Sequence, residues 1–292
     1  MPVASWPEAL ELQRLALTKY LKEPFDLIAV IDTDGTPGPY NLWDSSLRKK
    51  AINIAENTCE RVIIVPEEFH HDRSKIFTKT KELSGNIANL RAAVTLQHAF
   101  NTEILHDSNK ILILDNDMFP ITCFSWEEKM KENFCRSVVY ESRSRLRKKS
   151  ISHLWGGLMF INAAQIPFKQ IWSFDCGKIN GVKVDVSGNT YHWLNKVKEN
   201  RLESKFQTIR HLPSLQWNYS DLTKIFSDNI KKFIVEDERN INNNYYTEFY
   251  DDTFLHFRAG SNWKKEPAGV VKSRIDKFSD CLRSHVNGQL HE

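Results

Sequence analysis

The sequence predicts an α/β fold, because short β-branched apolar segments alternate with longer segments of helical periodicity. Hydrophobic residues make up 41% of the chain and charged residues 26%, which is ordinary for a packed globular protein. Several apolar segments also end in Asp, Gly or Pro, as strands do where they run into loops. No shift in composition divides the chain into two parts, so we expect one large α/β domain.

The expected elements of the first half alternate between helix and strand. Leu10, Leu17 and Leu21 recur at helical spacing and predict an amphipathic N-terminal helix. β-branched runs ending in turn residues predict the strands, and longer periodic segments predict the helices. In order, these elements are a helix within 1–25, a strand at 27–31, a helix at 45–56, a strand at 61–65, a helix at 76–100 and a strand at 110–114.

The second half continues this pattern with more loops. Ser125 and Glu128 have the spacing of a capping box, so a short helix is expected to begin there. A strand is expected at 155–162, entered through two glycines, and a helix is expected after Trp193 to about Lys198. We divide the chain into an N-terminal helix (1–25), a main domain (26–268) and a C-terminal appendage (269–292) that is expected to be helical.

Composition and charge exclude several classes of protein. The 40 Lys and Arg against 37 Asp and Glu leave a net charge of +3, which argues against a nucleic-acid partner. The longest apolar stretches, such as 27–31, fall far short of the ~20 residues that a transmembrane helix needs. No N-terminal segment resembles an export signal, and the five cysteines contain no CxxC pair. We expect a soluble, cytoplasmic protein with reduced thiols.

An acidic pair follows the strand expected at 110–114. Asp115 and Asp117 come directly after its apolar residues, which we expect to form a buried strand of parallel type. The carboxyl end of such a strand is where open α/β sheets bind ligands. Two ionised carboxylates ~4 Å apart repel by about 4 kcal/mol at an effective dielectric of ~20, and a divalent cation removes this conflict. The alternative is a strand end with two solvated acids.

A second acidic pair, Asp32 and Asp34, follows the first expected strand. With Gly35 and Thr36 it resembles the first motif of haloacid-dehalogenase-like phosphatases, in which the first Asp is the nucleophile and the second the acid/base. That resemblance implies a Mg²⁺-dependent phosphatase. The strand at 61–65 ends without the hydroxyl residue that the family requires, so this remains the alternative.

Four segments together resemble metal-dependent glycosyltransferases of the galactosyltransferase and glycogenin-like type. The segment around Asp115-Asn116-Asp117 resembles their DxD motif, and Gly156 to Asn162 is similar to the strand that lines their acceptor pocket. The segment 185–190 resembles the acid-containing turn before a helix that faces the transferred sugar. The segments 212–219 and 254–260 resemble a late strand pair that carries a histidine. The resemblance implies a GT-A fold, with a Rossmann-like mixed central sheet flanked by helices, over roughly 26–265.

The resemblance also implies a function and a set of site residues. The reaction would move a sugar from a nucleoside-diphosphate sugar to a hydroxyl acceptor on a glycan, a protein or a lipid-linked sugar. Mn²⁺, or Mg²⁺ in its place, would be bound by Asp115, Asp117 and His256. The residues expected at the donor are Asp32, Arg91, Asp115, Asn189 and Lys264. Lys264 lies in a segment that departs from the family pattern, since Trp263 precedes it.

The remaining site residues are expected on the acceptor side. Asp185 is the candidate catalytic residue, either as a general base in an inverting reaction or as a group that orients the donor sugar. Trp155, Gly156 and Gly157 are expected to line the acceptor pocket, and Trp193, Trp217 and Trp263 are further candidates for stacking on sugars. Loops near 143–149 or 240–244 are expected to close over the site. A non-catalytic nucleotide-sugar- or carbohydrate-binding protein on the same scaffold is a third hypothesis.

Overall fold

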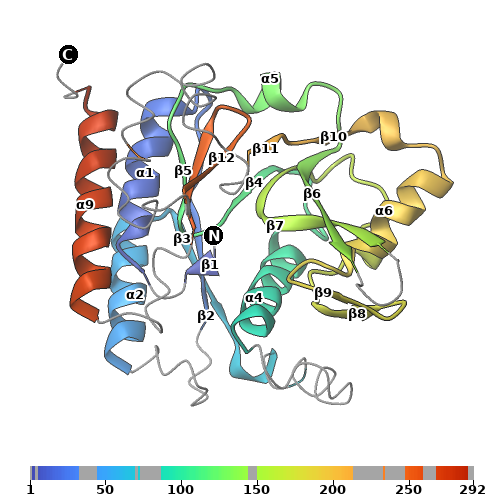
Figure 1. Cartoon of the computed structure of the whole chain (residues 1–292), viewed down its shortest axis with the longest axis horizontal. Coiled ribbons are helices and arrows are strands. Elements are labelled where there is room, and N and C mark those ends of the chain that lie inside the picture. The colour runs from blue at the N-terminus through green and yellow to red at the C-terminus, as the bar shows by residue number, and fades with distance from the viewer. Residues whose placement is uncertain are drawn as a thin grey trace.

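The computed structural model is a mixed α/β fold in which helices flank several small sheets (Figure 1). The structure describes residues 2–3, 6–32, 45–69, 72, 87–143, 150–212, 233, 247–258 and 268–288. Within these ranges the strands form one three-stranded sheet, two four-stranded sheets and one two-stranded sheet. The α/β class predicted from the sequence is therefore correct.

The N-terminal part forms a parallel sheet with helices beside it. Strand β1 (Pro2–Val3) and strand β3 (Arg61–Val65) pair on either side of β2 (Ile28–Asp32). Helix α1 (Ala9–Tyr20) buries an apolar face as its leucine spacing predicts, and helix α2 (Ser45–Thr58) packs beside it. The strand predicted at 61–65 has the observed bounds, and the strand predicted at 27–31 is shifted by one residue.

The central part carries the longest strands. Strand β7 pairs with β6 on one side and with β4 on the other, both antiparallel. Ser125 accepts a hydrogen bond from the Glu128 N–H at 3.1 Å, so the predicted cap of α5 is confirmed. The elements are α4 (Ile87–Glu103), β4 (Lys110–Leu114), β5 (Met118–Pro120), α5 (Trp126–Met130), β6 (Cys135–Arg143) and β7 (Ser150–Asn162).

The C-terminal part returns to the centre of the molecule through a hairpin and ends in a long helix. Strands β11, β12 and β13 join β5 in one antiparallel sheet, and β10 pairs in parallel with β6. The elements are β8 (Gly177–Ile179), β9 (Val182–Val184), α6 (Thr190–Glu199), β10 (Phe206–Thr208), β11 (His211–Leu212), β12 (Thr247–Tyr250), β13 (Phe254–Phe257) and α9 (Ala268–Val286), with 3₁₀ turns at Lys169–Ile171 and Glu203–Lys205.

Helices α1 and α9 run side by side and cover the sheet that contains β5 and β13 (Figure 1). Phe278 of α9 stacks on Phe257 with ring centroids 4.1 Å apart and lies 5.3 Å from Phe119. All three rings belong to the largest group of buried apolar side chains in the described part of the chain. The C-terminal helix is thus held by the same core as strands β5 and β13.

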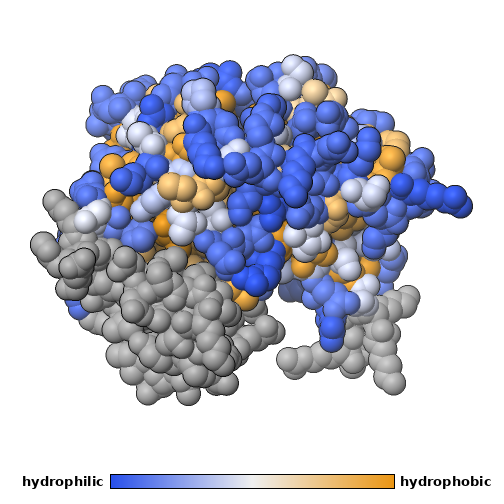
Figure 2. All heavy atoms as spheres, turned by 90° about the horizontal axis from the view of Figure 1, so that it is seen from above, coloured by the Kyte–Doolittle hydropathy of each residue, from blue (hydrophilic) through white to orange (hydrophobic). Residues whose placement is uncertain are grey.

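The surface in Figure 2 consists mostly of hydrophilic residues, with hydrophobic ones in separate small spots. Large apolar side chains with high exposure are few among the described residues: Ile64, Ile171 and Val270. Within the described ranges, no helix is long and apolar enough to cross a membrane.

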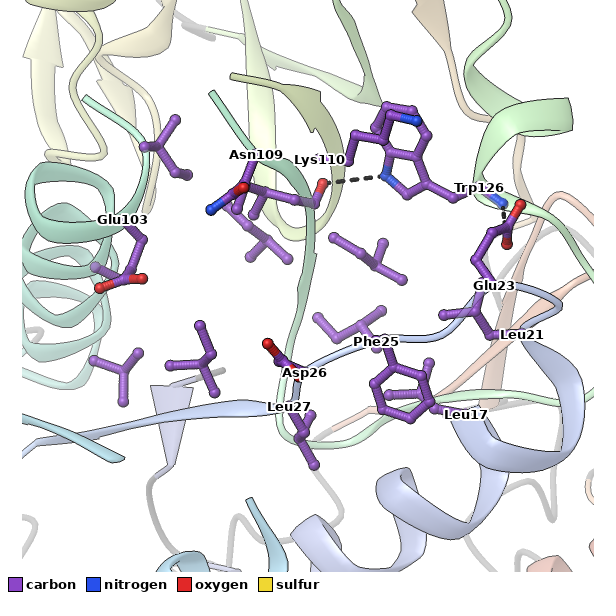
Figure 3. Close-up of a pocket in the computed structure, with 18 of the residues that line it drawn as sticks. Leu17, Leu21, Glu23, Phe25, Asp26, Leu27, Glu103, Asn109, Lys110 and Trp126 are labelled. Atoms are coloured by element: carbon purple, nitrogen blue, oxygen red, sulfur yellow. Dashed lines mark hydrogen bonds between the residues drawn. The ribbon is translucent and has the colours of Figure 1, made fainter. Parts of the chain in front are cut away.

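The predicted central sheet is divided in the structure. Strand β4 was expected to be a buried strand of parallel type, but its observed partner is the antiparallel strand β7. A cavity of about 390 Å³ is lined by residues of β4, such as Leu112, and of β2, such as Val30. Figure 3 shows this cavity with Lys110 of β4 and Leu27, which precedes β2, among the labelled residues. Within the described ranges β4 and β2 form no ladder, and the described strands make several small sheets.

Candidate metal centre

The pairing of β5 with β13 brings two distant segments together at the end of β4. Asp115 follows the last residue of β4, and Asp117 precedes the first residue of β5. In the antiparallel register His256 lies opposite Met118, and the Phe257 N–H donates to the carbonyl oxygen of Asp117 at 2.9 Å. A histidine 139 residues further along the chain is therefore fixed beside the acidic turn.

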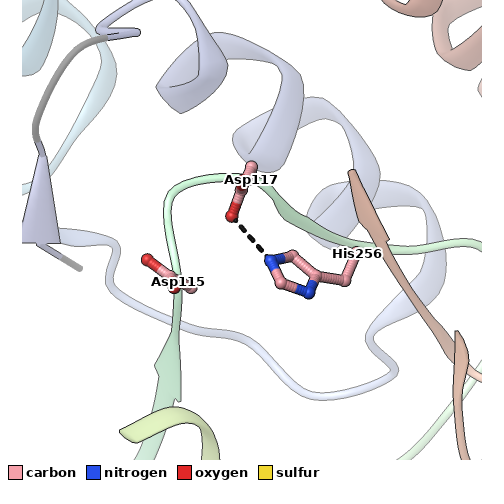
Figure 4. A group of neighbouring side chains, drawn as sticks. All are labelled: Asp115, Asp117 and His256. Carbon is pink, nitrogen blue, oxygen red and sulfur yellow. Dashed lines mark hydrogen bonds and ion pairs between the residues drawn. The ribbon is translucent and has the colours of Figure 1, made fainter. Parts of the chain in front are cut away.

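Asp115, Asp117 and His256 form a compact group of possible metal ligands (Figure 4). One ligand atom from each residue lies within 4.8 Å of the others, and His256 Nε2 is 3.1 Å from Asp117 Oδ1. His256 is buried, and the two aspartates are partly buried. Two carboxylate oxygens with one imidazole nitrogen suit a divalent cation such as Mn²⁺. The three predicted ligands are thus brought together, and the donor set fits a metal ion.

The electrostatics of this group also fit a cation. Burial and the negative charge of Asp117 raise the pKa of Asp115 to about 6, so a second anion is disfavoured here without a compensating charge. Burial favours a neutral His256, but Asp117 and Glu248 outweigh it and raise its pKa to about 10. A metal bound through His256 requires the neutral imidazole, so its binding would release a proton.

Glu248 is a buried carboxylate that supports this histidine and was not predicted from the sequence. Its Oε2 lies 3.2 Å from His256 Nδ1 and accepts the Tyr250 hydroxyl at 3.0 Å. Burial alone would raise the pKa of Glu248, but hydrogen bonds from His211 and His256 hold it well below the usual value. A carboxylate on the far nitrogen fixes the tautomer of a metal-binding histidine. The available sequence signal was an acid directly before two aromatic residues of strand β12.

Helix α1 holds the backbone of the acidic turn, and this contact was not predicted from the sequence. The Gln13 amide is fully buried and donates from Nε2 to the carbonyl oxygens of Asp115 at 2.7 Å and Met118 at 2.6 Å. From within the turn, the Asn116 amide donates to the Trp6 carbonyl oxygen at 2.8 Å. Gln13 lies on the apolar face of α1. A polar residue on an apolar helix face was the signal in the sequence that could have indicated this role.

The two glycines of β7 lie at an irregularity in the sheet. The register with β6 shifts between Ser137 and Val139, so β7 bulges at Trp155–Leu158. A Cβ atom at Gly157 would lie 2.2 Å from the Trp155 ring, and one at Gly156 would lie 2.5 Å from Ser187 Oγ. The Gly157 carbonyl accepts the Asp115 N–H at 2.7 Å, so the bulge is tied directly to the acidic turn.

Most of the predicted acceptor-side residues line a cavity of about 150 Å³. Its lining includes Asp115, the exposed carboxylate Asp185, and the site residues Trp155, Gly156 and Gly157. Trp155 also stacks on Tyr250 with a centroid distance of 5.1 Å and lies 5.3 Å from the His256 ring. The larger cavity of Figure 3 contains none of the predicted site residues in its described lining. The small cavity is therefore the one that adjoins the candidate metal centre.

The predicted donor residues that the structure describes lie outside the lining of the small cavity, apart from Asp115. Asp32 and Arg91 form a buried ion pair, with Arg91 Nε donating to Asp32 Oδ2 at 2.6 Å. Arg91 directly precedes Ala92, which lines the small cavity. The Asn189 amide donates to the Asp175 carbonyl oxygen at 3.0 Å and so holds the loop before α6. The structure brings none of these three into the described lining of the small cavity.

Trp193 does not reach this cavity. Its ring is fully buried, and its indole N–H donates to the Pro167 carbonyl oxygen at 2.8 Å, so the expectation that it stacks on a sugar is wrong. Several other predicted residues and segments lie outside the described residues: Asp34, Lys264, Trp217, Trp263, and the loops 144–149 and 240–244.

Comparison of the chain with protein-family models and with curated proteins gave no match.

Proposed function

We propose that this chain is a metal-dependent glycosyltransferase of the GT-A type that moves a sugar from a nucleoside-diphosphate sugar to a hydroxyl acceptor. One observation carries the proposal: Asp115, Asp117 and His256 converge within 4.8 Å from two distant segments. The cavity beside them holds a further carboxylate, an aromatic ring and two close-packed glycines. A metal centre next to a small pocket with few polar groups suits a charged donor that carries a sugar.

The roles of the residues follow from this arrangement. Asp115, Asp117 and His256 would hold the cation, and Glu248 would keep the His256 ring in place. A bound divalent ion would neutralise charge on the departing nucleoside diphosphate. The donor residues Asp32, Arg91, Asn189 and Lys264 remain proposals. For the first two, their mutual ion pair would orient the start of α4 toward the donor.

Asp185 is the proposed catalytic residue because it lines the cavity together with Asp115. Its carboxylate would either take the proton of the acceptor hydroxyl or orient the donor sugar. The sugar would pass through an oxocarbenium-like state, as in glycoside hydrolysis. Trp155 and the glycine pair would shape the side from which the acceptor enters. Tight packing there would also exclude water that would otherwise hydrolyse the donor.

The direct test is thermal unfolding with a panel of nucleotide sugars (UDP-glucose, UDP-galactose, UDP-N-acetylglucosamine and GDP-mannose), with and without Mn²⁺. Binding to the folded chain raises the melting temperature by mass action. We expect at least one nucleotide to do so only when Mn²⁺ is present. If no nucleotide and no metal shifts the unfolding, the proposal is wrong. Binding without donor hydrolysis or transfer would instead favour the non-catalytic binding protein.

The metal-site variant Asp117→Asn should abolish Mn²⁺-dependent donor hydrolysis, because it removes an anionic ligand and the negative charge beside His256 Nε2. We expect a loss of at least ~100-fold, the scale of removing one electrostatic stabiliser from an active site. The matched control is Asp280→Asn, which changes an exposed aspartate on α9. Full activity in Asp117→Asn would contradict the proposed metal site.

A further inference from the structure

The cavity of about 390 Å³ in Figure 3 has no part in the candidate metal centre, since none of the three candidate ligands lines it. Its volume lies in the usual range of ligand pockets, roughly 300–1,000 Å³. The whole of β4, from Lys110 to Leu114, lines this cavity, whereas no described lining residue comes from β7. The cavity therefore runs along the edge of β4 that β7 leaves free.

The main chain of β4 is open along this edge. At the two ends of the strand, the Asn109 carbonyl oxygen accepts from the residue after β7 at 2.9 Å, and the Asp115 N–H donates to β7 at 2.7 Å. Hydrogen bonds to an antiparallel partner involve every second residue, so Lys110, Leu112 and Leu114 direct their N–H and C=O groups to the other edge. Within the described ranges β4 pairs with no strand but β7, so these groups have no ladder there.

The side chains of β4 show the same gap in the packing. Leu112 packs on one face against the core group of Phe119, and Ile111 and Ile113 pack on the other face against the group of Phe100. A strand with a core on both faces is usually buried, yet all three side chains are only partly buried. The free edge explains this exposure, because a neighbouring strand there would complete the sheet.

The free main-chain groups indicate the kind of molecule that fits. A purely apolar ligand would bury the N–H and C=O groups of Leu112 and Leu114 without hydrogen bonds, which costs free energy. An extended peptide supplies those bonds as an added strand, and its alternate side chains can enter an apolar lining. Leu17, Phe25 and Trp126 are among the apolar residues that would receive them.

The charges around the cavity add a second requirement. Its ionisable lining residues are four acids and one lysine: Glu23, Asp26, Glu103, Glu127 and Lys110. Glu127 pairs with Lys110, and Glu103 pairs with Arg61. Glu23 and Asp26, both labelled in Figure 3, form no ion pair with a described residue. A basic side chain on the peptide would complement these two carboxylates.

We propose that this cavity binds an extended peptide segment of a partner protein, which adds a strand to the free edge of β4 and places a lysine or arginine beside Glu23 and Asp26. Main-chain hydrogen bonds to Lys110, Leu112 and Leu114 hold the segment, and apolar side chains at alternate positions fill the cavity. The interaction does not depend on the proposed activity, because the cavity contains none of the candidate metal ligands.

Hydrogen exchange of the free chain, followed for each amide by NMR, tests whether the edge is available. The N–H groups of Ile111 and Ile113 bond to β7, so we expect those of Leu112 and Leu114 to exchange at least ~10-fold faster, the effect of one absent hydrogen bond. Equally slow exchange of all four amides would overturn the proposal, because the edge would then already be covered by the chain itself. Slow exchange that begins only at a higher chain concentration would also overturn it and would identify a second copy as the occupant.

Peptide binding is tested with random dodecapeptides displayed on phage and selected on the wild-type chain. The selected peptide of highest affinity is synthesised with blocked ends, together with two copies that are each N-methylated on one of the two alternating sets of amides. N-methylation keeps the side chains but removes main-chain donors, and only one of the two sets faces β4. Calorimetry then gives the affinity of each peptide for the chain.

Two variants of the chain change the cavity itself. Ala99→Phe fills part of its space, and Asp26→Asn removes one carboxylate from its lining. The matched control is Asp280→Asn, which changes an exposed aspartate on α9. Melting curves show whether each variant is folded.

We expect one of the two methylated copies to bind about tenfold more weakly than the parent peptide, because it loses main-chain hydrogen bonds. Binding of the parent peptide should fall at least ~10-fold in Ala99→Phe, where the new ring takes its space, and about two- to fivefold in Asp26→Asn. Asp280→Asn should bind as the wild type does. The bound peptide should also slow the exchange of the Leu112 and Leu114 amides.

The proposal is wrong if no displayed peptide binds, or if binding is insensitive to the N-methyl groups and to both substitutions. A peptide that Asp26→Asn weakens but that neither methylated copy weakens is held by its charge alone, and this result also excludes an added strand. If Ala99→Phe does not fold, the methylated peptides and Asp26→Asn decide the outcome.

Discussion

Glu248 shows how a single buried residue controls the candidate metal centre. Its carboxylate contacts His256 Nδ1 at 3.2 Å and leaves Nε2 directed toward Asp117. Glu248→Gln keeps the size of the side chain but removes the charge that orients the imidazole. We expect Mn²⁺ affinity to fall by about 10–100-fold, the usual cost of losing such a supporting contact.

Mn²⁺ titration by calorimetry measures this effect, and Glu132→Gln, on an exposed glutamate, serves as the control. An unchanged Mn²⁺ affinity in Glu248→Gln would show that His256 does not bind the metal through Nε2.

Gln13 acts on the same site from the other side, through the backbone. Its amide holds both the Asp115 and Met118 carbonyl oxygens. Gln13→Leu retains the apolar packing but removes two hydrogen bonds, each worth roughly 0.5–1.5 kcal/mol, so we expect a loss of about 1–3 kcal/mol in the free energy of unfolding. Mn²⁺ affinity should fall as well, because the turn that carries both aspartates loses its support.

Urea unfolding and Mn²⁺ titration together test this role. Gln207→Leu makes the same change on an exposed strand position and should leave both quantities near wild type. A destabilised Gln13→Leu variant with normal Mn²⁺ affinity would mean that Gln13 supports the fold and not the site.

Among the elements, the bulge in β7 sets the shape of the small cavity. The Trp155 ring packs against Tyr250 and His256 and so has little room to move. Gly157→Ala would place a Cβ atom 2.2 Å from that ring, which forces the tryptophan or the bulge to shift. Overpacking of this kind costs typically 1–3 kcal/mol. We expect loss of donor hydrolysis together with a changed tryptophan fluorescence spectrum.

Gly269→Ala is the matched control, since a Cβ atom there meets nothing within 4 Å. This substitution on α9 should be neutral or stabilising by about 0.4–1 kcal/mol. If Gly157→Ala proves as active as Gly269→Ala, the bulge does not shape the site.

The same elements show what sequence patterns can and cannot predict. The strands at 61–65 and 110–114 were predicted with their observed bounds, because a short apolar run that contains Ile or Val and is bounded by polar residues is a local property. Whether β4 pairs with β2 or only with β7 depends on the packing of segments far apart in the chain, which no local pattern encodes. The division of the sheet was therefore missed, although strands were predicted at 27–31, 110–114 and 155–162, where β2, β4 and most of β7 lie.

For the candidate site too, the residues in a local pattern were predicted and those that depend on long-range packing were not. Asp115 and Asp117 were found because two acids after an apolar strand form a local pattern, and His256 was found through the resemblance. Glu248 and Gln13 were missed because their roles come from the register of β12 on β13 and from the docking of α1. Sequence reasoning identified the candidate ligands but not the residues that hold them.

At the scale of the whole molecule, the metal centre depends on both ends of the chain. Phe278 of α9 stacks on Phe257, the neighbour of His256, and contacts Phe119, two residues after Asp117. The C-terminal helix thus packs behind β13, which carries His256, and behind β5, which directly follows Asp117. Phe278→Ala would leave a space at this junction, and such truncations in a core cost about 3–5 kcal/mol.

We expect Phe278→Ala to lower the melting temperature and also to reduce the additional shift that Mn²⁺ produces, because β5 and β13 lose the ring that holds them in register. Val270→Ala removes an apolar side chain that is 46% exposed on the same helix and should change neither quantity. Thermal unfolding of both variants with and without Mn²⁺ separates the two effects. A Phe278→Ala variant that is destabilised but gains as much from Mn²⁺ as wild type would show that α9 supports the fold alone. A diminished Mn²⁺ shift would instead show that α9 supports the metal centre as well as the fold.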